Sequence, residues 1–142
     1  MKTNIDLHQL VECVGDAIIV SDANEKIVLW NPSATRIFGY TEDEALGQTL
    51  DLIVPDRQRQ RHSEGYSKSM QTGTTRYGTS LLKVPAKHKD GSTLSIAFTV
   101  GMLFDENHQA NGVVAIIRDE TARFAEERAL KKRIAELENP SA

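Results

Sequence analysis

The sequence predicts an α+β fold, a five-stranded antiparallel sheet with helices on one face and a flanking helix at each end. Three observations predict it. Residues 77–120 alternate between apolar and polar side chains in long runs separated by polar turns, a pattern typical of antiparallel strands. Two short apolar runs at 17–20 and 27–30 enclose a polar turn, which predicts a hairpin. Helical patterns occupy 31–72 between these strands, and a charged helical pattern follows at 121–138.

Length and composition favour one ordinary globular domain. The chain has 142 residues and a net charge of −3 that is not clustered, so no basic face indicates nucleic-acid binding. No apolar run approaches the roughly 18 residues that span a bilayer, and no membrane partner is expected. Cys13 is the single cysteine, which favours a cytoplasmic protein without disulfides. The chain has no nucleophile elbow, phosphate loop or catalytic dyad, so we expect no enzymatic activity.

The first elements are a short amphipathic helix and a hairpin. Residues 6–15 have Asp6 as a helix cap and Gly15 as a stop, with a narrow apolar stripe that suits packing against a partner. The polar residues 22–26 form the turn between the first two strands.

Short helices follow the hairpin. Asn31 and Pro32 are the cap and the first-turn proline of a short helix. Thr41 and Glu44 have the spacing of a capping box, which predicts a second short helix.

The longest internal helix is predicted at about 56–72, and it ends at Gly73. His62, Tyr66 and Met70 are spaced at i, i+4 and i+8, so they share one face. That face is the one that the helix can turn toward the sheet.

Three strands are predicted after this helix, at 78–88, 93–104 and 113–117. The Asp-Gly pair at 90–91 supplies the positive φ angles of a tight hairpin turn. Pro85 marks its strand as an edge strand, because proline cannot donate to a sheet ladder. Alternation places one apolar set on a single face of the second strand: Leu94, Ile96, Phe98, Val100 and Met102.

The order of these elements resembles the PAS sensor domain. Five motifs carry the resemblance: DAIIVSD (16–22), LWNPSA (29–34), FGYT (38–41), KDGS (89–92) and RDET (118–121). The resemblance implies a PAS domain at 16–120, between an N-terminal helix at 1–15 and a C-terminal signalling helix at 121–142. In this family the Asp119-x-Thr121 motif joins the sheet to the signalling helix. The family binds haem, flavins, small metabolites, fatty acids or nothing.

The stretch from Arg61 to Tyr66 is similar to the haem-bearing oxygen sensors of rhizobial histidine kinases. This similarity implies that His62 ligates the iron of haem b and that Tyr66 packs beside the ring. Imidazole on a rigid element facing an apolar cavity suits haem iron. The alternative is that His62 and Tyr66 are packing residues of a PAS domain without haem.

The same register assigns further residues of the cofactor site by resemblance. Lys68 and Arg76 fall where those sensors place cations near the haem propionates, although lone surface cations are more often solvated. Three residues fall on the wall of the distal side: Ile96, Phe98 and Val100. Leu82 replaces an arginine that hydrogen-bonds bound oxygen in those sensors, which implies weak oxygen binding here.

Other functions stay open. The chain lacks the cysteine motif of the blue-light flavin branch, and His8, His88 and His108 show no metal spacing. The alternatives to haem are an apolar metabolite or fatty acid in the cavity, or a cofactor-free dimerisation module. The two terminal helices predict a homodimer, and output is expected through a separate effector such as a histidine kinase.

Overall fold

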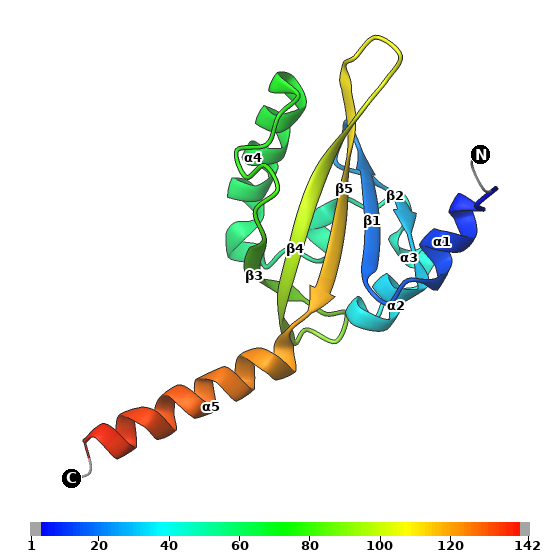
Figure 1. The fold of residues 1–142 in the computed structure, drawn as a ribbon. Coiled ribbons are helices and arrows are strands. Elements are labelled where there is room, and N and C mark those ends of the chain that lie inside the picture. Colours follow the sequence, from blue (N-terminus) through cyan, green and yellow to red (C-terminus); the bar gives the residue numbers. More distant parts are fainter. Residues whose placement is uncertain (1–3, 140–142) are drawn as a thin grey trace.

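The computed structural model describes residues 4–139 as one antiparallel sheet with helices against one face (Figure 1). The predicted terminal segments therefore extend beyond the described residues at 1–3 and 140–142. Along the sheet the strand order is β2-β1-β5-β4-β3, and every neighbouring pair is antiparallel. The strands are β1 (Ala17–Asp22), β2 (Ile27–Trp30), β3 (Leu82–Lys87), β4 (Thr93–Phe104) and β5 (Ala110–Asp119). The predicted five-stranded α+β fold is confirmed.

Residues 4–139 contain five α-helices, and side-chain caps set the starts of the first three. They are α1 (Leu7–Cys13), α2 (Pro32–Phe38), α3 (Glu42–Ala45), α4 (Arg59–Thr72) and α5 (Thr121–Glu138). Asn31 accepts from the Ala34 amide at 3.0 Å, and Thr41 and Glu44 form the predicted capping box. Single 3₁₀ turns at Leu50–Leu52 and Asp56–Gln58 lead into α4. None of the helices in residues 4–139 combines the length and apolar character needed to cross a membrane.

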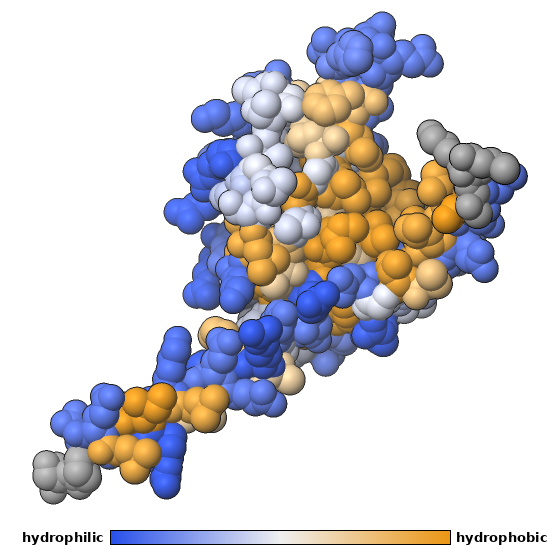
Figure 2. Space-filling view, viewed as in Figure 1, coloured by the Kyte–Doolittle hydropathy of each residue, from blue (hydrophilic) through white to orange (hydrophobic). Residues whose placement is uncertain are grey.

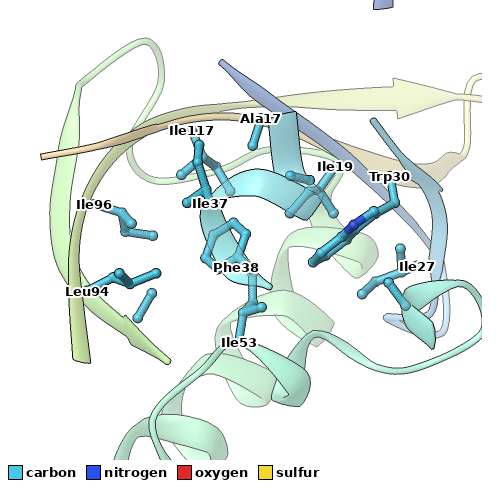
Figure 3. Packing of buried hydrophobic residues seen from close by; sticks show 13 residues of the cluster. Ala17, Ile19, Ile27, Trp30, Ile37, Phe38, Ile53, Leu94, Ile96 and Ile117 are labelled. Atoms are coloured by element: carbon cyan, nitrogen blue, oxygen red, sulfur yellow. The ribbon is translucent and has the colours of Figure 1, made fainter. Parts of the chain in front are cut away.

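The core lies between the sheet and the short helices. Phe38 of α2 occupies the middle of the cluster, with Leu94 and Ile96 on one side and Trp30 on the other (Figure 3). The Trp30 and Phe38 ring centroids are 5.8 Å apart, and both side chains are fully buried. Burying aromatic side chains of this size is a major source of folding free energy.

Strand register separates an inner from an outer face of the sheet. Ile19 pairs with Trp30, and Phe98 pairs with Ile117, so these residues share the inner face with the core. Their sequence neighbours share the outer face, where Figure 2 shows apolar side chains gathered over β1, β4 and β5. The outer apolar residues include Ile18, Val20, Leu103, Val114 and Ile116. This face therefore has apolar surface that no helix of the described chain covers.

The strands β1 and β5 are adjacent at the centre of the sheet, although they are the first and last in sequence. Ala17 pairs with Ile117, so the segment leading into β1 meets the end of β5. The guanidinium of Arg118 lies 3.3 Å from the Asp16 carboxylate, and this hydrogen bond raises the pKa of Arg118. The two segments are thereby paired at one end of the sheet.

The prediction that strand β3 starts at residue 78 is wrong. It begins at Leu82, and residues 76–79 form turns in which Gly78 has a positive φ of 56°. Its pairing with β4 alone confirms that Pro85 lies on an edge strand. The last strand is longer than predicted and spans Ala110–Asp119, because the chain continues to pair with β4 on both sides of its apolar centre.

Candidate functional site

The helix α4 supplies the candidate site, and Tyr66 fixes it to the sheet. Tyr66 is the buried residue of this helix, which ends at Gly73 in the left-handed conformation with φ 73°. The Tyr66 hydroxyl lies 2.8 Å from Ser21 Oγ and donates to the Asp22 carbonyl oxygen at 2.5 Å. Burial raises the pKa of Tyr66 to about 12, so the hydroxyl stays protonated and able to donate near neutral pH.

One turn earlier, His62 meets a carboxylate from the β1–β2 turn. His62 Nδ1 lies 2.9 Å from Glu25 Oε1, and the Ser63 hydroxyl donates to Glu25 Oε2 at 3.1 Å. The Glu25 side chain is only 13% exposed. We name Glu25, His62 and Ser63 the carboxylate clasp, because they join α4 to the turn between β1 and β2.

Glu25 is held in a strained conformation. Its φ is +66°, in the left-handed region that residues with a Cβ disfavour. The turn is built by Asp22, whose Oδ1 accepts from the amides of Asn24 and Lys26 at 2.9 and 3.0 Å. Sequence reasoning missed Glu25, since its partners lie 37 and 38 residues away and no local pattern identifies them.

A cleft of about 430 Å³ opens between α4, the β1–β2 turn and the start of β5. It is lined by Ala23, Asn24, Glu25, Ser63, Tyr66, Ser67, Met70, Gln71 and Ala110. Of the residues that the sequence predicts for a cofactor site, Tyr66 is the one that lines this cleft. The cleft is therefore a neighbour of the predicted site and does not coincide with it.

The predicted strand residues lie together on the inner face. Leu82 pairs with Phe98, and Phe98 packs against the core cluster to which Ile96 belongs. Val100 is half-buried beyond Phe98 along β4, and Val84 of β3 is 39% exposed. The side chains of Leu82, Ile96, Phe98 and Val100 contain no hydrogen-bond donor.

The two predicted cations lie elsewhere. Lys68 is exposed on α4, and Arg76 lies in the loop before β3 and not on a strand. The Arg76 guanidinium donates to the Tyr77 hydroxyl at 2.9 Å and lies 4.9 Å from the centre of that ring. The structure thus brings together His62 with Tyr66, and Leu82 with the β4 residues, but it does not bring the cations to either group.

The remaining histidines and the cysteine lie apart from α4. His8 pairs with Glu12 on α1 at 3.6 Å, and His88 pairs with Asp90 in the β3–β4 turn at 3.1 Å. His108 lies in the β4–β5 turn, and Cys13 is exposed at the end of α1. Within residues 4–139, no three His, Cys, Asp or Glu side chains come together as a site for a bare metal ion.

His62 meets one requirement of an axial haem ligand, a hydrogen-bond partner for its second ring nitrogen. A metal-bound histidine usually donates its second ring N–H to a carboxylate or carbonyl, which fixes the ring and its tautomer. Glu25 provides such a partner for Nδ1, and Nε2 of His62 makes no hydrogen bond within the described residues. The donor set is thus suited to iron ligation through Nε2.

The start of α5 is joined to the sheet through Thr121. The Thr121 hydroxyl donates to Asp119 Oδ1 at 2.5 Å and accepts from the Ser95 amide at 3.0 Å. The Glu120 amide donates to the Ser95 carbonyl at 2.8 Å. The first turn of α5 is therefore hydrogen-bonded directly to β4, the strand that carries Ile96, Phe98 and Val100.

The family model for the PAS fold matches residues 5–119. The chain belongs to the PAS fold family. The crystal structure of the PAS domain of a protein from Colwellia psychrerythraea superposes with a TM-score of 0.71 at 24% identity, covering 82% of this chain and 95% of that one. PAS domains are sensory modules, and this chain is a PAS sensory domain.

Two curated relatives of this PAS domain are named as sensors. Sensor protein FixL of Bradyrhizobium diazoefficiens is 30% identical over 95 residues, covering 67% of this chain and 19% of the relative. Oxygen sensor protein DosP of Escherichia coli is 22% identical over 123 residues, covering 87% of this chain and 15% of the relative. The chain thus spans less than a fifth of the length of either relative.

Proposed function

We propose that this PAS domain is a cytoplasmic sensor that holds haem b between α4 and the inner face of the sheet, with His62 as the axial ligand. The observation that carries the proposal is the 2.9 Å contact of His62 Nδ1 with Glu25, which leaves Nε2 for the iron. Bound haem supplies a redox-active iron that can also bind diatomic gases. The similarity of residues 61–66 to the rhizobial haem sensors supports the haem site, and the relative DosP, named as an oxygen sensor, supports a sensory role.

The inner face supports an apolar cofactor with a weak affinity for oxygen. Val84, Phe98 and Val100 are at least partly exposed on the face that bears the core, so an apolar ring could bury them further. Bound oxygen needs a donor, whereas carbon monoxide does not. Leu82 offers none at the position where the similar sensors have arginine, which favours carbon monoxide or redox sensing.

The relay of the signal is proposed to run through Thr121. A displacement of β4 by an occupant of the inner face acts on the Ser95 amide, which donates to Thr121 at the start of α5. The charged helix α5 then carries the change to an effector. A further relative, 23% identical over 120 residues, is named sensor histidine kinase TmoS of Ectopseudomonas mendocina and supports such a partner, either as a separate protein or in the same chain.

The deciding experiment is the absorption spectrum of protein purified from haem-sufficient cells and of protein reconstituted with haem. We predict a Soret band that His62→Ala abolishes, because His62 supplies the iron ligand. His8→Ala, His88→Ala and His108→Ala serve as matched controls and should leave the band unchanged. Loss of the band in one of these controls, with His62→Ala unaffected, would place the iron elsewhere.

An apolar metabolite or fatty acid is the second candidate. The observation that favours it is the same partly exposed inner face, which presents Val84 and Val100 without requiring a metal. Mass spectrometry of organic extracts of the purified protein distinguishes the two candidates. Protein without a Soret band that releases a stoichiometric lipid supports this candidate.

A cofactor-free dimerisation module is the third candidate. Leu7 and Leu10 of α1 are exposed, as are Leu130, Ile134 and Leu137 of α5. A protein that forms a dimer but contains neither haem nor an extractable ligand would support this module over the other two functions.

A further inference from the structure

We infer that Glu25 is a positioning residue for His62 whose hydrogen bond to Nδ1 makes the ring a stronger electron donor, so that an iron held by His62 favours the ferric state. This inference rests on the proposed haem function and deepens it, because it names redox state as the signal. Glu25 lies outside the motifs that the sequence shares with the haem sensors.

The first step is the contact between the carboxylate and the ring. Glu25 Oε1 lies 2.9 Å from His62 Nδ1, within the range of charge-assisted hydrogen bonds. A carboxylate that accepts this N–H raises the basicity of the ligand nitrogen on the other side of the ring. A more basic axial ligand donates more electron density to iron and stabilises its higher charge, since hydrogen bonding around the ligands is one of the factors that set haem potentials.

The second step is that the carboxylate cannot readily turn away. The Ser63 hydroxyl donates to Oε2 at 3.1 Å, so both oxygens of Glu25 have partners on α4. The Glu25 amide donates to the Asp22 carbonyl at 3.0 Å, and the Leu50 amide donates to the Glu25 carbonyl at 3.3 Å. The positive φ of Glu25 persists because these contacts fix the residue from both sides, and such strain is concentrated at functional sites.

The third step is that no fixed cation cancels this carboxylate. Within residues 4–139, His62 is the ion-pair partner of Glu25, and no lysine or arginine pairs with it. The carboxylate is mostly shielded from water, so solvent screens its charge weakly. Among the described residues, the imidazole of His62 and the hydroxyl of Ser63 are therefore the side-chain groups that contact this carboxylate.

Spectroelectrochemistry of the haem-reconstituted protein tests the inference. Glu25→Gln keeps an oxygen that can accept from Nδ1 but removes the charge, so it should raise the midpoint potential. We expect at least a tenfold shift toward the ferrous form, which is about 59 mV for a one-electron couple. Glu64→Gln removes an exposed carboxylate from the same helix and should leave the potential unchanged.

Two results separate this inference from the haem proposal itself. Absence of a Soret band in the unmodified protein contradicts the proposed function, whereas a normal band with equal potentials in Glu25→Gln overturns the role of Glu25. The haem-free protein gives a second readout, because two-bond ¹⁵N–¹H NMR reports the tautomer of His62. We expect the Nδ1–H tautomer of the neutral ring in the unmodified protein and the Nε2–H tautomer in Glu25→Ala. The Nε2–H tautomer in the unmodified protein would also overturn the inference.

Discussion

Tyr66 shows how one buried side chain can determine where a helix rests. Its ring lies under α4, and its hydroxyl reaches Ser21 and Asp22 at the end of β1. Burying the hydroxyl without hydrogen-bond partners would destabilise the folded state, because the lost hydration would not be replaced. The helix is therefore fixed at this point by polar contacts and not by a broad apolar face.

The raised pKa of Tyr66 predicts a pH dependence of stability. The folded-state pKa of about 12 lies above the ordinary value of 10.0, so Tyr66 contributes stability that is fully present below pH 10. That contribution is lost as the pH rises from 10 to 12. Urea unfolding of the unmodified protein should therefore show a steeper fall in the free energy of unfolding over this range than Tyr66→Phe shows.

Tyr66→Phe also tests the hydrogen bonds at neutral pH. The variant keeps the ring but removes the hydroxyl that donates to the Asp22 carbonyl, which still accepts from the Glu25 amide, so it should lose about 0.5–1.5 kcal/mol of stability at pH 7. Tyr77→Phe is the matched control, because the Tyr77 hydroxyl is exposed and contacts only Arg76 among the described residues. Parallel pH profiles for Tyr66→Phe and the unmodified protein would contradict the assignment.

In the carboxylate clasp, the sequence predicts the helix residues but not their partner on the turn. Helical periodicity places His62 and Tyr66 on the side of α4 that meets the rest of the chain, since i and i+4 share a face in any helix. Glu25 could not be found in that way. Its position depends on a left-handed turn residue and on a contact across 37 positions, which only the assembled fold provides.

The individual elements were predicted most reliably where a local rule fixes them. Asn31 with Pro32, and Thr41 with Glu44, set helix starts through contacts within four residues. The start of β3 was missed, because alternation from Gly78 to Leu82 resembles a strand although the chain there forms turns. Side-chain alternation alone cannot show where pairing stops: β4 continues to Phe104, but β3 pairs with it only as far as Phe98, because residues 76–79 form turns.

The hydrogen bonds of the Thr121 hydroxyl lead to a prediction about helix α5. Thr121→Val removes the donor to Asp119 and the acceptor for the Ser95 amide, so the first turn of α5 should loosen. The expected loss of stability is about 1–2 kcal/mol, and hydrogen exchange of the Ser95 amide should become faster. Thr121→Ser keeps the hydroxyl and is the matched control.

An unchanged exchange rate at Ser95 in Thr121→Val would show that β4 and α5 are not coupled through this hydroxyl. The proposed relay would then need another route, such as the hydrogen bond from the Glu120 amide to the Ser95 carbonyl.

Across the whole molecule, exposed apolar surface is concentrated on the outer face of the sheet and on the terminal helices. Ile116 and Leu103 are exposed on the outer face, and Leu130 and Leu137 of α5 are 63% and 65% exposed. Contiguous apolar surface of this kind indicates an interface with another chain. We therefore keep the homodimer as a prediction.

Sedimentation velocity at micromolar concentration tests the dimer. Leu130→Glu with Leu137→Glu places two charges on the apolar stripe of α5 and should shift the protein toward the monomer. Arg128→Gln with Lys132→Gln changes the net charge by the same two units on the opposite side of the helix, since successive residues turn by about 100°. This control should remain dimeric, and a monomeric unmodified protein would contradict the prediction.

The central pairing of β1 with β5 has a consequence for any polypeptide that contains this domain. Ala17 and Ile117 face each other across one ladder, and Arg118 and Asp16 bridge the same point, so the chain enters and leaves the fold side by side. Segments on the two sides of the domain therefore start from one point of the sheet. A rearrangement of the sheet that tilts this junction changes the directions of α1 and α5 together.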